Sequence, residues 1–207
     1  MIVKEASSFY LLVGLGNPGS AYEQTRHNIG FHVLEDFARR RGWVFKTVAN
    51  LHGRLAQGVF EGKKMLLLLP MTYMNSSGES LRVVVDYFKI STNNIMVISD
   101  DISLPFRALR IKPSGSSGGH NGLKSIEAHL GSQIFPRMRV GVGDRTHGAL
   151  ADYVLSRFSE EEIKQLPYLF DKAVAAVEVW IKEGIVKAMQ IANGHQEEKK
   201  PESNVGE

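Results

Sequence analysis

Side chains that could take part in chemistry follow three separate apolar runs of the sequence. Asn17 and His27 follow the first run, Tyr73 and Asn75 the second, and Asp100 the third. Short apolar runs are typical of buried strands, and parallel strands bring their carboxyl ends to one edge of a sheet, where α/β proteins keep their sites. A neutral histidine there can act as a general base if a carboxylate fixes its tautomer and stabilises the imidazolium. Nearby asparagines would supply neutral donors and acceptors to an ester and a water.

A fourth polar segment is the loop SGSSGG at residues 114–119, which runs directly into His120 and Asn121. Glycine leaves backbone N–H groups unobstructed, so a loop of this kind can cradle a phosphate or an oxyanion. We expect the loop to close over the strand ends and to bring His120 and Asn121 to the same site.

Each of these residues also has a plainer interpretation, which the sequence leaves open. A histidine beside a helix start can be a surface or capping residue. Asp100 can cap a turn at the end of its strand. Asn75 and Asn121 can be the N-caps of the helices that follow them. Tyr22 and Tyr73 can fill the core as readily as they can stack on a base.

Two other kinds of chemistry are not expected. His27, His120 and Asp100 could form a metal site, but the chain has no close ligand pair such as HxH or HExxH, so we predict neither a metal nor a cofactor. The chain also contains no cysteine and no GxSxG elbow, which argues against a covalent acyl-enzyme.

The first turn literally matches a dinucleotide-binding fingerprint, Gly14-x-Gly16-x-x-Gly19. Three observations count against a nicotinamide enzyme. Pro18 has no backbone N–H to offer a pyrophosphate, and the helical period begins near Thr25 rather than at the last glycine. No acidic residue follows the next expected strand to hold a ribose.

Hydrophobic periodicity predicts a single α/β domain. We expect the domain to span residues 1–194, with a frayed start at 1–8, and residues 195–207 to form a disordered, charged tail. Strands are expected at residues 10–13, 43–48, 52–60, 64–69, 94–99, 107–112 and 138–142. Helices are expected at about residues 25–41, 81–88 and 123–130, and after a capping box formed by Ser159 and Glu162, with a restart at Pro167 and an interruption at Gly184.

The composition is that of a globular protein with one substantial core, at 207 residues and 43% hydrophobic content. No apolar run approaches the roughly 20 residues that a membrane helix requires, and the first apolar run has neither the length nor the basic flank of a signal peptide. Together with the absence of cysteine, this favours a cytoplasmic protein without membrane contact.

The charge is unevenly distributed along the chain. Between Asp101 and Asp144 six basic residues face a single acid, Glu127, whereas the whole chain carries a net charge of only +3. A segment of one sign indicates an anionic partner such as the phosphates of a nucleic acid. The alternative is that folding points these residues in different directions. The six basic residues are Arg107, Arg110, Lys112, Lys124, Arg137 and Arg139.

Taken together, these segments closely resemble the motifs of bacterial-type peptidyl-tRNA hydrolases. The resemblance rests on VGLGNPG, on YEQTRHNIG at residues 22–30, on MTYMNSSG at 71–78, on GSSGGHNGL at 115–123, and on the strand that ends in Asp100. It covers about residues 9–193. It implies one α/β domain with a mixed, mostly parallel sheet between helices. It also implies hydrolysis of the ester that joins a peptide, or an N-blocked amino acid, to the terminal ribose of tRNA.

The resemblance also implies roles for individual residues. His27 resembles the base that activates water, Asp100 the carboxylate that supports it, and Asn17 the residue that distinguishes blocked from free aminoacyl ends. Asn75 and Asn121 would hold substrate and water. The other residues that the resemblance places against the aminoacyl group, the tRNA terminus or the acceptor-stem phosphates are Tyr22, Tyr73, Met74, His120, Arg110, Lys112, Lys124, Arg137 and Arg139.

One residue departs from the family pattern, because Ser103 stands where a second aspartate is expected. We expect this change to alter hydrogen bonding in the loop and not the pair formed by His27 and Asp100. The partner implied is peptidyl-tRNA, not DNA, and the protein is expected to be a monomer. A non-catalytic RNA-binding module on the same sheet is the alternative, against which the complete set of polar residues argues.

Overall fold

The computed structural model describes residues 9–143 and 150–194. The expectations for residues 1–8 and for a tail at 195–207 lie outside this part of the chain. The strands are β1 (Tyr10–Gly14), β2 (Lys46–Val48), β3 (Gly53–Phe60), β4 (Lys63–Pro70), β5 (Ile95–Asp101), β6 (Leu109–Lys112) and β7 (Arg137–Gly141). The helices are α1 (Ile29–Arg39), α2 (Ser77–Phe88), α3 (Asn121–Leu130), α4 (Leu150–Val154), α5 (Glu160–Ile163), α6 (Leu166–Glu183) and α7 (Ile185–Asn193).

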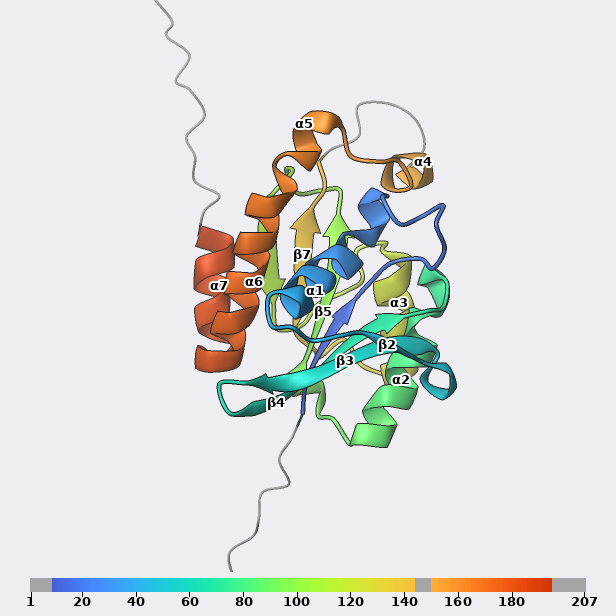
Figure 1. Cartoon of the computed structure of the whole chain (residues 1–207), viewed down its shortest axis with the longest axis vertical. Helices are drawn as coiled ribbons and strands as arrows, with labels where there is room; N and C mark the ends of the chain where they lie inside the picture. Colours follow the sequence, from blue (N-terminus) through green and yellow to red (C-terminus); the bar gives the residue numbers. More distant parts are fainter. Residues whose placement is uncertain (1–8, 144–149, 195–207) are drawn as a thin grey trace, which may run out of the picture.

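The strands of the described chain form one twisted sheet in the order β2-β3-β4-β1-β5-β7-β6 (Figure 1). β1 pairs in parallel with β4 and β5, and β5 pairs in parallel with β7. The hairpin of β3 and β4 and the pairing of β6 with β7 are antiparallel. The predicted mixed, mostly parallel sheet is therefore confirmed, and the central strands end at one common edge.

Helices cover both faces of the sheet, because the central strands are apolar on both sides. Along β1, Leu12 packs with α1 and α6 on one face, whereas Leu11 and Val13 pack with α2 and α3 on the other. Figure 1 shows α1, α6 and α7 on one side of the sheet, and α2 and α3 on the other. The domain is thus a three-layer α/β structure, and no helix in its described part is long and apolar enough to cross a membrane.

The glycines of the apparent dinucleotide fingerprint serve packing. A Cβ atom on Gly14 would lie 2.3 Å from the carbonyl oxygen of Gly30, so two glycines are needed where α1 crosses β1. No helix begins at Gly19. A 3₁₀ turn, η1 (Arg26–Asn28), comes first and leads into α1. The arrangement lacks the helix N-terminus that would hold a pyrophosphate.

Several expected boundaries are wrong. The strand expected at residues 43–48 contains only Lys46–Val48, and the one expected at 107–112 begins at Leu109 because Arg107 has a positive φ of 68°. The helix expected at about residues 25–41 begins as η1 and ends at Arg39. The capping box of Ser159 and Glu162 is confirmed, although the helix that it starts is short.

Candidate active site

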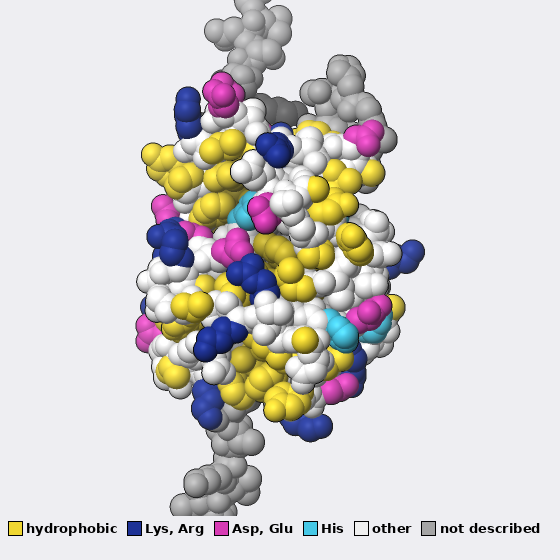
Figure 2. Space-filling model, turned by 45° about the vertical axis from the view of Figure 1, so that its right-hand side comes forward, with side chains coloured by type: hydrophobic (Ala, Val, Ile, Leu, Met, Phe, Trp, Pro, Cys, Tyr) yellow, Lys and Arg dark blue, Asp and Glu magenta, His cyan; other side chains and the backbone are white. Residues whose placement is uncertain are grey.

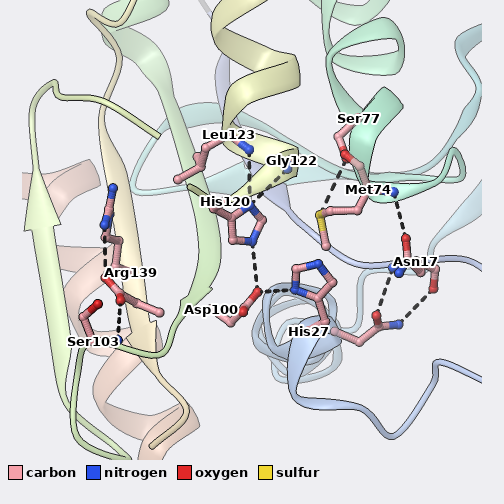
Figure 3. Close-up of polar contacts among 12 residues, drawn as sticks. Asn17, His27, Met74, Ser77, Asp100, Ser103, His120, Gly122, Leu123 and Arg139 are labelled. Carbon is pink, nitrogen blue, oxygen red and sulfur yellow. Dashed lines mark hydrogen bonds and ion pairs between the residues drawn. The ribbon is translucent and has the colours of Figure 1, made fainter. Parts of the chain in front are cut away.

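One carboxylate at the end of β5 is shared by two histidines (Figure 3). Oδ1 of Asp100 lies 2.7 Å from Nδ1 of His27 and 2.9 Å from Nε2 of His120. The three side chains come from β5, from η1 and from the residue before α3. Residues 73 positions apart in the sequence therefore meet within hydrogen-bonding distance at the edge of the sheet.

The tautomer of His120 follows from its neighbours. Its Nδ1 atom accepts backbone N–H bonds from Gly122 at 3.1 Å and from Leu123 at 3.3 Å, so it caps the N-terminus of α3. A nitrogen that accepts two N–H bonds carries no proton, and the neutral ring therefore carries its proton on Nε2. That N–H donates to Asp100. The N-cap of α3 is thus His120, not Asn121, which is the first helical residue.

The protonation of His27 follows from that of Asp100. Burial of the Asp100 carboxyl acts to raise its pKa, but the interactions with His120 and His27, including the hydrogen bonds that both rings donate, outweigh burial and hold this pKa well below its usual range. The carboxylate is ionised and accepts only, so Nδ1 of His27 is its donor. The lone pair on Nε2 of His27 then remains to accept a proton.

A second network holds the turn that carries His27. The backbone N–H of Asn17 donates to Oδ1 of Asn28 at 2.9 Å, and Nδ2 of Asn28 donates back to the carbonyl of Asn17. Oδ1 of Asn17 accepts the backbone N–H of Met74 at 2.8 Å. The amide orientation of Asn17 is thereby fixed, and its Nδ2 donor makes no hydrogen bond to another described residue. Figure 3 draws His27 between this network and Asp100.

A cavity of about 310 Å³ opens beside the two histidines. His27, Asp100, His120 and Asn121 line it together with the glycine loop, as the sequence predicts. Its other lining residues include Ser103, Arg139 and two residues of α4, Ala151 and Val154. Ser103 donates its backbone N–H to Asp101 and leaves the pair of His27 and Asp100 intact.

His27, Asp100 and His120 each offer a possible metal-ligand atom, and these atoms lie within 4.8 Å of one another. The tautomer of His120 nevertheless does not suit a metal. A metal on Nε2 would require the proton to move to Nδ1, where it would face the N–H groups of Gly122 and Leu123. The geometry therefore fits two N–H donors, one on each histidine, hydrogen-bonded to Asp100 better than it fits a bound cation.

The asparagines, tyrosines and methionine that are also predicted to meet the substrate do not line this cavity, apart from Asn121. Asn17 borders a neighbouring hollow of about 230 Å³. Tyr22 and Tyr73 form an edge-to-face pair with centroids 6.5 Å apart. Tyr22 is half-buried and Tyr73 is 62% exposed, so neither is a core residue. Asn75 is exposed within a 3₁₀ turn and makes no capping bond, whereas Met74 is buried.

The basic segment divides on folding. Lys112 and Lys124 are exposed and Arg110 is half-buried, while Arg139 lines the cavity and contacts Asp101 and Ser116. Arg137 is fully buried and contacts Glu127, so its guanidinium faces the protein interior and not the solvent. Figure 2 shows basic side chains scattered among acidic and hydrophobic ones on the face in view, not gathered into one patch.

Sequence reasoning missed several residues that shape the site. Asn28 orients Asn17, and its place directly after His27 in one motif was a usable signal. Ala151 and Val154 belong to a short helix far along the chain and gave no signal of their own. Arg26, the neighbour of His27, is buried and pairs with Glu162, and no local sequence pattern predicts this contact.

A single α/β domain holds an ionised carboxylate, an oriented imidazole and a cavity beside them, which is the arrangement of an enzyme that uses a general base. The family model described as peptidyl-tRNA hydrolase matches residues 11–202. The peptidyl-tRNA hydrolase of Clostridium acetobutylicum is 45% identical over 185 residues, which cover 89% of this chain and 98% of that protein. That of Lachnospira eligens is 47% identical over 186 residues, covering 89% and 100%.

A solved structure agrees with these sequence relatives. The crystal structure of peptidyl-tRNA hydrolase from Acinetobacter baumannii superposes with a TM-score of 0.84 at 36% identity, covering 90% of this chain and 95% of that one. The chain therefore belongs to the peptidyl-tRNA hydrolase family. The family, fold class and enzyme class predicted from the sequence are confirmed.

Proposed function

We propose that this protein hydrolyses the ester between tRNA and a peptide, or an N-blocked amino acid, with His27 as the general base. The observation that carries the proposal is the 2.7 Å hydrogen bond from Nδ1 of His27 to Asp100, which leaves Nε2 as the basic atom. The ester is activated, so a base and a water suffice without a covalent intermediate.

Each proton transfer in the proposed reaction passes through His27. Nε2 of His27 takes a proton from water as the water oxygen forms a bond to the ester carbonyl carbon. The bond from that carbon to the ribose oxygen then breaks, and the ribose oxygen receives the proton from His27. Asp100 stabilises the imidazolium between these steps, as an oriented carboxylate does in other histidine-based sites. His120 supplies the second N–H that keeps Asp100 ionised.

Asn17 provides a chemical basis for selecting blocked substrates. Its Oδ1 is occupied by the N–H of Met74, so the side chain offers the substrate a donor only. An N-acyl group presents a carbonyl that accepts this bond. A free α-amino group is largely protonated near neutral pH, presents only donors, and finds no partner there.

The other asparagines and the tyrosines would hold the rest of the reacting end. Asn121, which lines the cavity, and the exposed Asn75 would hold substrate and water. Tyr22 and Tyr73 would line the approach of the tRNA terminus and the aminoacyl group, where an exposed ring can stack on a base. Met74 would support this surface from below.

The tRNA body would be held through its backbone. Arg110, Lys112, Lys124 and Arg139 are our proposed contacts to acceptor-stem phosphates, and Arg137 is excluded by its burial. Phosphate contacts position a nucleic acid without reading its sequence, which suits an enzyme that serves many tRNAs. We further propose a monomer that works in the cytoplasm without a metal or cofactor.

A hydrolysis assay tests the proposal directly. The purified protein is incubated with N-acetyl-aminoacyl-tRNA and, in parallel, with the free aminoacyl-tRNA, each with and without a chelator. We expect release from the blocked substrate only, at a rate that the chelator does not change. Tight binding of the blocked tRNA without any release would instead identify a non-catalytic RNA-binding module.

A further inference from the structure

Arg26 lies directly before the proposed base and is 7% exposed. Its guanidinium donates to both carboxylate oxygens of Glu162, at 2.8 and 2.7 Å, and to the carbonyl oxygen of Val142 at 2.9 Å. The same group lies over the rings of Tyr153 and Phe158, with its carbon 4.7 and 4.8 Å from their centroids. Bidentate pairing and stacking together are contacts that lysine cannot reproduce.

These contacts join the turn that carries His27 to one wall of the cavity. The backbone N–H of Arg26 donates to the carbonyl of Ser156, and Thr25 forms a β-bridge with Arg157. Tyr153 lies in α4, the helix whose residues Ala151 and Val154 line the cavity. Within the described chain, α4 packs principally against η1.

The base itself has other supports. The turn of His27 is tied to Asn17 through the side chain of Asn28, and it continues directly into α1, whose apolar face is buried in the core. Loss of the Arg26 guanidinium would therefore loosen α4 while leaving the pairing of His27 with Asp100 in place. α4 would keep the hydrogen bond of Tyr153 to Val142 and the backbone contacts of Arg26 and Thr25. The shape of the cavity would change, because Ala151 and Val154 of α4 form part of its wall.

We infer that Arg26 is a positioning residue for substrate, which holds the α4 wall at its working distance from His27 with Glu162 as its counterion. The acidic partner is suited to this task, since burial acts to raise the pKa of Glu162 while the hydrogen bonds of Arg26 and the backbone lower it, with a net decrease that keeps the carboxylate charged. This inference rests on the proposed function, because the cavity is taken to hold the aminoacyl end of the substrate.

The test compares Arg26, which is buried, with Arg41, which is half-buried. Arg26→Lys keeps the charge but loses the bidentate and stacked contacts. The matched control is Arg41→Lys, because Arg41 is also stacked on a ring, pairs with Glu178, and lies between α1 and α6, away from the site. With N-acetyl-aminoacyl-tRNA, we expect Arg26→Lys to raise KM about tenfold and to change kcat less than twofold, which is the signature of lost uniform binding. Arg41→Lys should leave both constants unchanged at a comparable loss of Tm.

A change in Tm alone for Arg26→Lys, matching that of Arg41→Lys, would overturn the inference, and so would a fall in kcat at constant KM. If Arg26→Lys does not fold, Glu162→Gln carries the same test with an expected threefold rise in KM. Binding is also measured by filter retention in a His27→Ala background, where the substrate stays intact. In that background Arg26→Lys should raise Kd about tenfold. This measurement tests the inference whether or not the wild type shows hydrolysis.

Discussion

Two clusters of ionisable side chains border hollows of nearly equal size, and they differ in whether they leave a basic atom unused. The cluster of His27, Asp100 and His120 lines a cavity of about 310 Å³. The cluster of Arg41 and Glu178, which lies between α1 and α6, borders one of about 340 Å³. The size of the hollow therefore does not distinguish a site from a surface groove.

The distinction lies in what each cluster leaves unused. In the Arg41 cluster, each arginine pairs with an acid: Arg41 with Glu178, and Arg40 with Asp36 and Asp171. Nε of Arg41 makes no hydrogen bond, but it carries a proton and cannot act as a base. In the Asp100 cluster, Oδ1 of Asp100 accepts one hydrogen bond from each of the two histidines. Nε2 of His27 keeps a free lone pair. A balanced cluster stabilises the fold, whereas a cluster with an oriented, unused base can act on a substrate.

The largest effect is expected from removing that base. His27→Ala should lower kcat for N-acetyl-aminoacyl-tRNA about a thousandfold, since general base catalysis contributes roughly 10²- to 10⁴-fold. The Tm should change little, because the ring is at the cavity and Asn28 keeps its own bonds to Asn17. Single-turnover rates and a thermal melt measure the two quantities. A variant that retains near wild-type turnover would remove His27 from the mechanism.

A smaller loss should follow from removing only the charge of its support. In Asp100→Asn, the side-chain oxygen can still accept from both His27 and His120, so the rings keep their orientation. The amide cannot stabilise an imidazolium as a carboxylate does. We expect kcat to fall about a hundredfold with KM within a factor of two. Equal losses in Asp100→Asn and His27→Ala would show that orientation, and not charge alone, depends on the carboxylate.

The sequence was sufficient to predict which residues meet at the edge of the sheet. It was insufficient to predict which of the basic side chains on β7 is buried. Apolar runs ending in polar residues placed His27 and Asp100 correctly, because strand ends in a parallel sheet share an edge whatever the details of packing. The alternation along β7 was visible too, yet it could not tell Arg137 from Arg139, which share a face. Only the position of α3 buries the first against Glu127 and leaves the second at the cavity.

Contacts across long stretches of chain account for the other omissions. The pairing of Arg26 with Glu162 spans 136 residues, and nothing in the local pattern of either segment predicts it. The capping role near α3 went to His120 because its ring, and not the amide of Asn121, faces the free N–H groups of the helix. A hydrogen bond of this kind depends on a side-chain rotamer, which periodicity does not specify.

A third prediction concerns binding of the tRNA body. Lys112→Ala combined with Arg139→Ala should raise KM about tenfold and flatten its dependence on salt. With fewer phosphate contacts, binding of the tRNA releases fewer counterions. Lys172→Ala, an exposed lysine on α6, is the matched control and should change neither. KM measured from about 50 to 200 mM salt separates the outcomes. An unchanged slope in the double variant would place the phosphate contacts elsewhere.

The smallest effect on activity is expected at the balanced cluster, where the comparison predicts a change in stability alone. Arg41→Met keeps a long apolar chain over the rings of Phe37 and Phe60, but removes the partner of Glu178. Glu178 is partly exposed, so its unpaired charge can be hydrated and the cost should be only about 1 kcal/mol. That corresponds to a Tm lower by about 2–4 °C for a chain of this length. Both kcat and KM should stay within a factor of two of wild type. A substantial loss of activity at unchanged Tm would mean that the Arg41 cluster affects the active site through α1. The distinction between the two clusters would then not hold.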